Sequence, residues 1–384
     1  MTSLLVIIVL VLLAIALWQL TKIFDLTQVG VSKDNSQVAN DEDNNIQGYL
    51  MFGFLAFIYI FTIYGLFKWG GLVLHTPASE HGGMVDNLMN ITWIVIFAVQ
   101  AFTQVLVHYF SFKYRGSKDR KALYFSDSTK LEIIWSAIPA LVLAVLILYG
   151  LYAWTNIMFI DEDDDSIVIE VYAQQFNWKA RYSGEDNVLG KANVRLIEGV
   201  NALGVDLADP NAQDDIVVTE LHIPKGKKIH FKFRSQDVLH SAYFPYFRAQ
   251  MNCVPGMVTE FAFTPIYTTD EYRELPYMVA KVANINKIRS DKSIELLANG
   301  GTALDPYSFD YLLLCNKICG ASHYNMQMKV VVDTPEDYKK WLSDKTTIVQ
   351  EVKGANAPKA TEDGAGNDSI KAKDTAAISK IAMK

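Results

Sequence analysis

The sequence predicts a membrane-anchored all-β protein, in which transmembrane helices precede a β-sandwich. Two observations lead to this fold class. Four long segments contain no Asp, Glu, Lys or Arg, and all of them lie within the first 154 of the 384 residues. Beyond them, short stretches of strand-like composition recur between residues 166 and 332. This uneven distribution excludes a single soluble globule, although only 51% of the whole chain is hydrophobic.

The charge-free segments are long enough to cross a bilayer, because about 20 apolar residues in a helix span the hydrocarbon core. They cover residues 3–20, 49–67, 91–112 and 133–154. The first segment resembles a secretory signal in length. It has no positive charge before it and no Ala-x-Ala site after it, so we expect an uncleaved helix. Pro139 in the fourth segment is tolerable in a membrane helix.

A basic loop between the third and fourth segments predicts the orientation in the membrane, because short loops rich in Lys and Arg stay in the cytoplasm. The fourth helix then runs outward, and everything after residue 154 lies outside, which in a bacterium is the periplasm. The basic residues of this loop are Lys113, Arg115, Lys118, Arg120, Lys121 and Lys130.

Four parts follow from this topology. Residues 1–46 form an N-terminal transmembrane helix and a cytoplasmic loop, and residues 47–154 form three further transmembrane helices. Residues 155–345 form the external domain. Residues 346–384 are rich in Ala, Lys, Asp and Gly without periodicity, which predicts a disordered tail.

The external domain is predicted to be a β-sandwich followed by one helix. About seven strand-like runs with turn residues between them suggest an antiparallel sandwich. Thr334, Pro335 and Asp337 predict a capped helix start, and the helix should run to about Ser343. The clearest strand-like runs are residues 166–172, 216–223, 228–233, 256–263, 311–314 and 326–332.

The external domain carries the whole formal charge of the chain. It contains 27 acidic and 20 basic residues, and the net charge of the chain is −7. Solubility alone explains most acidic domains. A field of this sign would also attract a basic partner and increase its rate of encounter at low salt.

Sulfur and imidazole side chains near the end of the domain predict a metal site. Cys315, Cys319, His323 and Met326 have the spacing Cys-x3-Cys-x3-His-x2-Met. Two thiolates, an imidazole and a thioether form a soft ligand set that selects copper, whereas a structural zinc site takes four Cys or His ligands. A disulfide is the alternative, but it leaves His323 and Met326 unexplained. A second imidazole is expected from His240, just beyond a predicted strand.

The remaining histidines and the third cysteine have simpler interpretations. His222 and His230 lie on other strands and are expected to be ordinary surface or core residues. Cys253 is expected to be a small buried hydrophobic residue. No Cys-x-x-Cys-His motif is present, so the chain attaches no c-type haem covalently. The histidines of the membrane part, which should not reach the site, are His75, His81 and His108.

On these residues the chain resembles subunit II of the haem–copper cytochrome c oxidases, over about residues 85–345. The segments Asp237-Val-Leu-His240-Ser and Val254-Pro-Gly256 match the first ligand loop of that family. The segment Leu131-Glu-Ile-Ile-Trp135-Ser-x-x-Pro139 matches the start of its second helix. The resemblance implies a cupredoxin-like Greek-key sandwich that holds the binuclear copper centre CuA.

The resemblance also implies the copper ligands. Cys315 and Cys319 would bridge both coppers. His240 and Met326 would complete one copper, and His323 and the backbone carbonyl of Lys317 would complete the other. The chain would then carry out electron transfer only and contain no catalytic residue, while the haems and the reduction of oxygen would belong to subunit I.

Several residues depart from the family pattern or extend it. Lys317 stands where the family has a glutamate that binds magnesium, which puts that magnesium site in doubt. Phe176 replaces the tryptophan that receives electrons from cytochrome c in that family, and Trp178 is retained. Both are therefore electron-transfer candidates. The alternative for Trp178 is that it is an ordinary core aromatic residue. Glu132 is the proton-uptake candidate, or simply a charge favoured at a helix start. Two extra N-terminal helices and an insertion at residues 268–308 are further departures, and the insertion is either a contact for the electron donor or a plain surface loop.

The implied function is that of subunit II of a proton-pumping terminal oxidase in the bacterial inner membrane. Its partners would be subunits I and III and a donor, which is cytochrome c or a membrane-held c-type cytochrome, with a supercomplex with a quinol-oxidising complex as one arrangement. No nucleic acid is expected. The alternatives are a copper-free subunit II, as in quinol oxidases, and a copper-delivery protein. A copper-delivery protein would require a labile, methionine-rich site.

Overall fold

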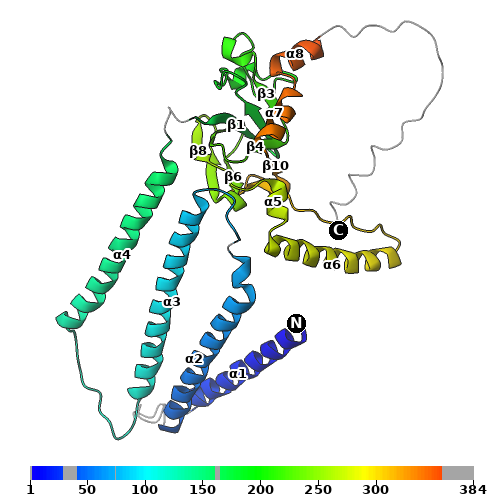
Figure 1. The fold of residues 1–384 in the computed structure, drawn as a ribbon. Coiled ribbons are helices and arrows are strands. Elements are labelled where there is room, and N and C mark those ends of the chain that lie inside the picture. The colour runs from blue at the N-terminus through cyan, green and yellow to red at the C-terminus, as the bar shows by residue number, and fades with distance from the viewer. Residues whose placement is uncertain (1, 29–40, 74, 161–164, 357–384) are drawn as a thin grey trace.

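The computed structural model describes residues 2–28, 41–73, 75–160 and 165–356. Four long helices occupy the N-terminal part, and Figure 1 shows them as a splayed group below a β-rich domain. They are α1 (Thr2–Gln28), α2 (Asp41–Trp69), α3 (Gly82–Lys113) and α4 (Thr129–Met158). Each is longer than the charge-free segment that predicted it, because polar residues extend the helix beyond the apolar stretch.

Three spans among the described residues are long and apolar enough to cross a membrane, namely Asp41–Leu72, Gly82–Lys113 and Thr129–Met158. This confirms the second, third and fourth predicted helices. Within α1, the described part of the apolar stretch is Ile7–Thr21, which is shorter than these spans. That α1 crosses the membrane therefore stays a prediction.

The start of α2 lies beside the basic loop that follows α3. The backbone N–H of Lys118 donates to Asp41 Oδ1 at 3.0 Å, and Arg115 Nε donates to Asn45 Oδ1 at 2.6 Å. Acidic residues at the start of α2 therefore lie near the basic loop, as an antiparallel pair of membrane helices requires.

The domain is a sandwich of two five-stranded sheets. The first has the order β3-β2-β1-β5-β8 and the second has the order β4-β10-β9-β6-β7. Side chains alternate between the core and the outside, most regularly in β5, where Ile229, Phe231 and Phe233 are buried. The strands are β1 (Ile167–Gln174), β2 (Asn177–Tyr182), β3 (Ile216–Val218), β4 (Leu221–Pro224), β5 (Ile229–Ser235), β6 (His240–Phe244), β7 (Ala249–Cys253), β8 (Thr259–Phe263), β9 (Tyr311–Cys315) and β10 (Gln327–Asp333).

The predicted sandwich is confirmed, but two details of the prediction are wrong. The sheets are not purely antiparallel, because β1 pairs with β5 and β4 pairs with β10 in parallel. The run 216–223 is not one strand, since the chain bends after Val218 and continues as β4 in the other sheet. Where the chain crosses from one sheet to the other, a strand can pair with a strand far away in the sequence. Such long crossover connections permit parallel pairing.

The sandwich is attached to the N-terminal end of α3. Arg248, at the end of a short 3-10 helix, binds Asp86 of α3 through Nε at 2.6 Å and Nη2 at 3.0 Å. Its Nη2 also donates to the carbonyl of His75 at 2.5 Å. Ser79 Oγ donates to the carbonyl of Phe247 at 2.6 Å. The segment between α2 and α3 thus becomes part of the base of the domain.

Helices α5 (Thr269–Arg273) and α6 (Pro276–Ala298) fill most of the 268–308 insertion, which the sequence did not predict to be helical. Helix α7 (Pro335–Ser343) confirms the predicted cap, because the N–H of Asp337 donates to Thr334 Oγ1 at 3.2 Å. Short 3-10 helices occur at Gly70–Leu72, Val194–Leu196, Pro210–Ala212, Pro245–Phe247 and His323–Asn325.

The predicted start of the tail at residue 346 is wrong. Ile348–Asn356 form helix α8, and Ile348 and Val349 are buried against Leu203 and Val205 of the loop segment before β3. The segment is short and mostly polar, but the packing of these two apolar side chains against the domain orders it. The rest of the predicted tail, residues 357–384, lies outside the described residues.

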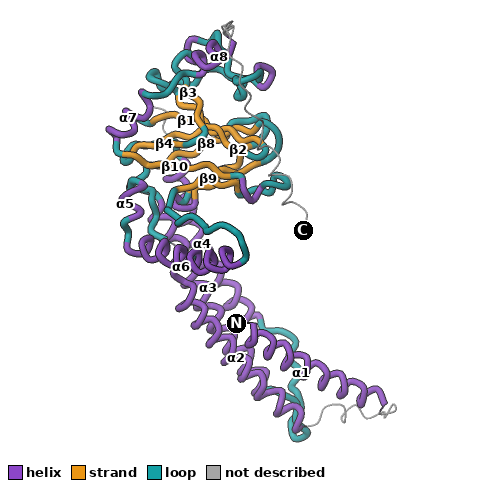
Figure 2. Tube along the Cα trace, turned by 90° about the vertical axis from the view of Figure 1, so that its right-hand side faces the viewer, coloured by secondary structure: helices purple, strands orange, loops and turns teal. Residues whose placement is uncertain are grey.

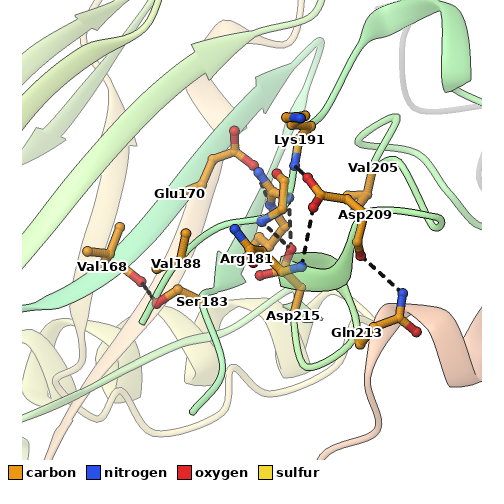
Figure 3. Close-up of polar contacts among 12 residues, drawn as sticks. Val168, Glu170, Arg181, Ser183, Val188, Lys191, Val205, Asp209, Gln213 and Asp215 are labelled. Atoms are coloured by element: carbon orange, nitrogen blue, oxygen red, sulfur yellow. Dashed lines mark hydrogen bonds and ion pairs between the residues drawn. The ribbon is translucent and has the colours of Figure 1, made fainter. Parts of the chain in front are cut away.

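A buried group of charges closes the loop segment 183–215 onto the first sheet (Figure 3). Arg181 binds Glu170 at 2.7 Å and Asp215 at 3.0 Å, and Arg234 binds the other oxygen of Glu170 at 2.8 Å. Asp215 Oδ2 also accepts from the N–H of Gly190, whereas its buried Oδ1 has no hydrogen-bond partner among the described residues. Burial raises the pKa of Asp215 to about 6, against the opposing charge of Arg181.

Candidate metal centre

Three neighbouring strands of the second sheet bring the predicted ligands together. His240 begins β6, Cys315 ends β9, and Met326 immediately precedes β10, which pairs with β9. The N–H of Cys315 donates to the carbonyl of Met326 at 3.0 Å, and the N–H of Asn316 donates to the carbonyl of Ser241 at 3.0 Å. These bonds close the loop 316–326 at its base.

Each of the other four predicted donor atoms lies within 3.8 Å of one of the two cysteine sulfurs. The Sγ atoms of Cys315 and Cys319 are 3.8 Å apart. Cys315 Sγ is 3.7 Å from Nδ1 of His240 and 3.3 Å from the carbonyl oxygen of Lys317. Cys319 Sγ is 3.6 Å from Nδ1 of His323 and 3.8 Å from Sδ of Met326.

The donor set fits a pair of soft metal ions better than one. The sulfur separation far exceeds the roughly 2.05 Å of a disulfide bond, and both thiols are free. A metal–thiolate bond is about 2.3 Å long, so one ion can contact both sulfurs. A single four-coordinate ion would leave two of the six donors unused. Two ions that share both sulfurs and take two further donors each would use all six, and thiolate and thioether ligands favour copper.

Metal binding at this site must displace protons. Burial, together with the neighbouring Cys315 thiol, raises the pKa of the Cys319 thiol to about 11. A thiolate rather than a thiol is the ligand, so the affinity for a metal should increase with pH. Lys317 contributes only its carbonyl oxygen, and its side chain is exposed.

The sequence did not predict a supporting role for Asp237. Its Oδ1 lies 2.8 Å from Nε2 of His240, and its Oδ2 accepts from the N–H of Gln175 at 2.8 Å. Burial alone would raise the pKa of Asp237, but these hydrogen bonds outweigh that effect and lower the pKa. Because Nδ1 of His240 faces the sulfurs, Nε2 carries the proton and donates it to this carboxylate, which fixes the ring orientation. The spacing Asp-x-x-His between Asp237 and His240 is the sequence feature that could have indicated this role.

The two aromatic candidates contact the ligand loop. Trp178 is 2% exposed, and its Nε1 donates to the carbonyl of Met326 at 3.4 Å. Phe176 is half-buried beside Gly320, where a Cβ atom would lie 2.8 Å from Cζ of Phe176. Gly320 also has a φ of 143°, so glycine is required there for two reasons.

The other residues singled out in the sequence supply no donor atom to this centre. His222 binds Asp333 at 2.6 Å and His230 binds Glu260 at 3.1 Å, which agrees with their predicted ordinary roles. Glu132 is exposed in the first turn of α4, at the end of that helix away from the domain. Cys253 is fully buried opposite His240 in the strand register, as predicted, and burial raises the pKa of its thiol to about 12.

These observations define a membrane-anchored β-sandwich with a soft-metal site at one end. Comparison with known proteins agrees with this class. Residues 67–152 match the family model of the cytochrome c oxidase subunit II transmembrane domain. The chain is 34% identical over 298 residues to the alternative cytochrome c oxidase subunit 2 of Bradyrhizobium diazoefficiens, covering 76% of this chain and 91% of the relative.

A more distant relative is the cytochrome c oxidase subunit 2 of Thermostichus vulcanus, which is 23% identical over 302 residues. The alignment covers 72% of this chain and 79% of that relative. Given the 34% relative, the chain belongs to the cytochrome c oxidase subunit II family. Among solved structures, the periplasmic domain of subunit II of the Bradyrhizobium japonicum cytochrome oxidase is 14% identical and covers 47% of this chain and 93% of that one. Its TM-score with this chain is 0.27.

We predict that Asp237→Asn lowers the affinity for copper by about 10- to 100-fold, the usual effect of losing a carboxylate behind a metal-binding histidine. Competition with a chelator of known affinity measures this. Asp333→Asn is the matched control, because Asp333 forms the same kind of bond with His222, which lies outside the metal centre. Equal affinities for the Asp237→Asn variant and the unaltered protein would show that Asp237 does not position His240.

Proposed function

We propose that this chain is subunit II of a proton-pumping terminal oxidase, which accepts electrons from a c-type cytochrome and passes them to a haem of subunit I, where oxygen is reduced to water. The observation that carries the proposal is the set of six donor atoms around two thiols 3.8 Å apart. Membership of the family supports it.

The ligands divide naturally between two copper ions. Cys315 and Cys319 would bridge them, His240 and Met326 would complete one, and His323 and the carbonyl of Lys317 would complete the other. Each ion would then take one donor from beside each sulfur. Bound there, the copper pair would supply one-electron redox chemistry. The paired strands and Asp237 hold the ligands in place, which limits their movement when the charge changes.

A copper-free subunit II of the quinol-oxidase kind is disfavoured by the same observation. Without a metal, nothing would require two thiols, two imidazoles and a thioether to converge beside the partly buried bond between Asp237 and His240. Lys317 offers no carboxylate for magnesium, so a magnesium ion at that position is not part of the proposal. Haems are assigned to partner subunits.

The proposed donor is a basic c-type cytochrome, either soluble or held in the membrane beside a quinol-oxidising complex. The net charge of −7 on the external domain supports a basic partner. Electrons would reach the copper pair through Phe176 or Trp178, which both touch the ligand loop. The other proposed partners are subunits I and III, in the inner membrane of a bacterium, with the sandwich in the periplasm.

We predict two copper ions per chain and a seven-line paramagnetic resonance pattern from one unpaired electron shared by two nuclei. Cys315→Ser or Cys319→Ser should abolish this pattern, and Met326→Leu should retain copper while raising the reduction potential. Cys253→Ser is the control, because Cys253 is buried outside the donor set and should leave the spectrum unchanged. A single copper, or zinc in its place, would contradict the binuclear assignment.

Glu132 is proposed to guide protons from the cytoplasm into subunit I, because it is an exposed carboxylate at the start of α4. We predict that Glu132→Ala slows oxygen consumption without altering the copper spectrum. Lys130→Ala is the control, since it removes a charge from the same helical turn but no proton-accepting carboxylate. Unchanged turnover of the Glu132→Ala enzyme would refute this role.

Donor binding should depend on salt. The charge of the external domain is screened beyond about 8–10 Å at physiological ionic strength. We therefore predict that donor-driven oxygen consumption falls as ionic strength rises, while turnover with a small uncharged reductant does not. Equal salt dependence of the two activities would mean that electrostatic attraction does not govern docking.

A further inference from the structure

Helix α6 begins at the level where the chain leaves the membrane. The ring of Tyr277 stacks on His75, with centroids 5.0 Å apart, and Tyr272 Oη donates to the carbonyl of Thr76 at 2.6 Å. His75 follows the membrane span of α2 by only three residues, since that span ends at Leu72. Figure 1 shows α6 running across the direction of α2 and α3, at about the height of the upper end of α2, and Figure 2 places it below the sandwich.

One side of α6 packs on the protein. Asn286 Nδ2 donates to the carbonyl of Tyr307 at 3.1 Å, and Arg289 Nε donates to the carbonyl of Asp305 at 2.7 Å. The N–H of Leu304 donates to Ser293 Oγ at 2.9 Å. The segment that returns from α6 therefore covers this side of the helix.

The uncovered part of α6 presents apolar side chains to the surroundings. Val279, Ile294 and Leu297 are 54%, 67% and 57% exposed, and their spacing together with Ala283 places them along one side of the helix. Ile288, on another side, is 59% exposed. Such exposure would be unfavourable in water, whereas amphipathic helices at a membrane surface bury side chains of this kind in the boundary of the acyl chains.

The charge of α6 is opposite to that of the domain. The helix has four basic and two acidic residues, whereas the external domain has a net charge of −7. Lys287 and Lys292 are exposed, and neither forms an ion pair within residues 41–73, 75–160 and 165–356. This charge makes α6 itself unsuited to a basic cytochrome, although the whole insertion 268–308 has six acidic and five basic residues. A surface of anionic phosphates fits the charge of the helix.

We propose that α6 is an interfacial helix that lies on the outer surface of the membrane. Val279, Ile294 and Leu297 enter the boundary of the acyl chains, and Lys287 and Lys292 bind the phosphates of anionic phospholipids. The helix thereby holds the base of the sandwich against the lipid surface. This inference is independent of copper and of electron transfer.

The experiment uses the assembled oxidase in lipid nanodiscs, with a bimane fluorophore on an introduced cysteine. The variants are Ile294→Cys and Leu297→Cys, and Leu196→Cys is the control, because Leu196 is exposed in the 183–215 segment beyond the sandwich. Quenching by lipid-attached nitroxide reports contact with lipid, and quenching by iodide reports contact with water. Labelling of the parent protein gives the background from native cysteines.

Lipid quenching several-fold above that of the Leu196→Cys control, with weak iodide quenching, is the expected result for Ile294→Cys and Leu297→Cys. Stronger quenching by iodide would place α6 in water and overturn the proposal. Protection from both quenchers would show that another protein covers α6, and would overturn it equally.

A second arm tests the lysines. Adding phosphatidylglycerol to phosphatidylcholine discs should increase lipid quenching at Ile294→Cys, and the Lys287→Gln/Lys292→Gln pair should remove this increase. Lys339→Gln/Lys340→Gln on α7 is the matched control, because both lysines are exposed on a helix of the sandwich. An unchanged response to phosphatidylglycerol in the Lys287→Gln/Lys292→Gln variant would overturn the assignment of phosphate binding.

Discussion

The metal centre depends on the adjacency of β6, β9 and β10 in the second sheet. His240 begins β6, Cys315 ends β9 and Met326 immediately precedes β10. These residues meet only because the three strands are neighbours. The bond between the N–H of Cys315 and the carbonyl of Met326 then fixes the ends of the loop that carries the remaining donors. A sheet with another strand order would scatter the ligands, however well each strand formed.

A second constraint fixes the sandwich relative to the membrane. Arg248 reaches from the sandwich to Asp86 on α3 and to the carbonyl of His75, and α6 leans on the same outer segment through Tyr277. Ion pairs and stacked rings replace a flexible linker at this point. In the proposed role, such attachment would keep the distance between the copper pair and the haem of subunit I constant.

The sequence predicted the membrane helices and the residues whose donor atoms converge, because both depend mainly on local signals, namely charge-free segments and the spacing of rare residues. It could not predict the strand partners. The run 216–223 has continuous strand character, yet its halves belong to different sheets, and only long-range packing decides that. Asp237 illustrates the same limit, because its bond to His240 requires the loop to fold before the carboxylate has a partner. The burial of Ile348 and Val349 likewise depends on a surface built from residues far away in sequence.

The buried charges around Asp215 have a consequence for the surroundings of the domain. A carboxyl whose folded pKa lies near 6, above its usual value, contributes stability at low pH and loses that contribution as the pH rises toward 6. In the proposed role the domain faces the compartment into which protons are exported. Acidification of that compartment protonates Asp215, whose buried oxygen then carries less uncompensated charge. In that role, a proton gradient that acidifies the compartment would stabilise the domain at this position rather than unfold it.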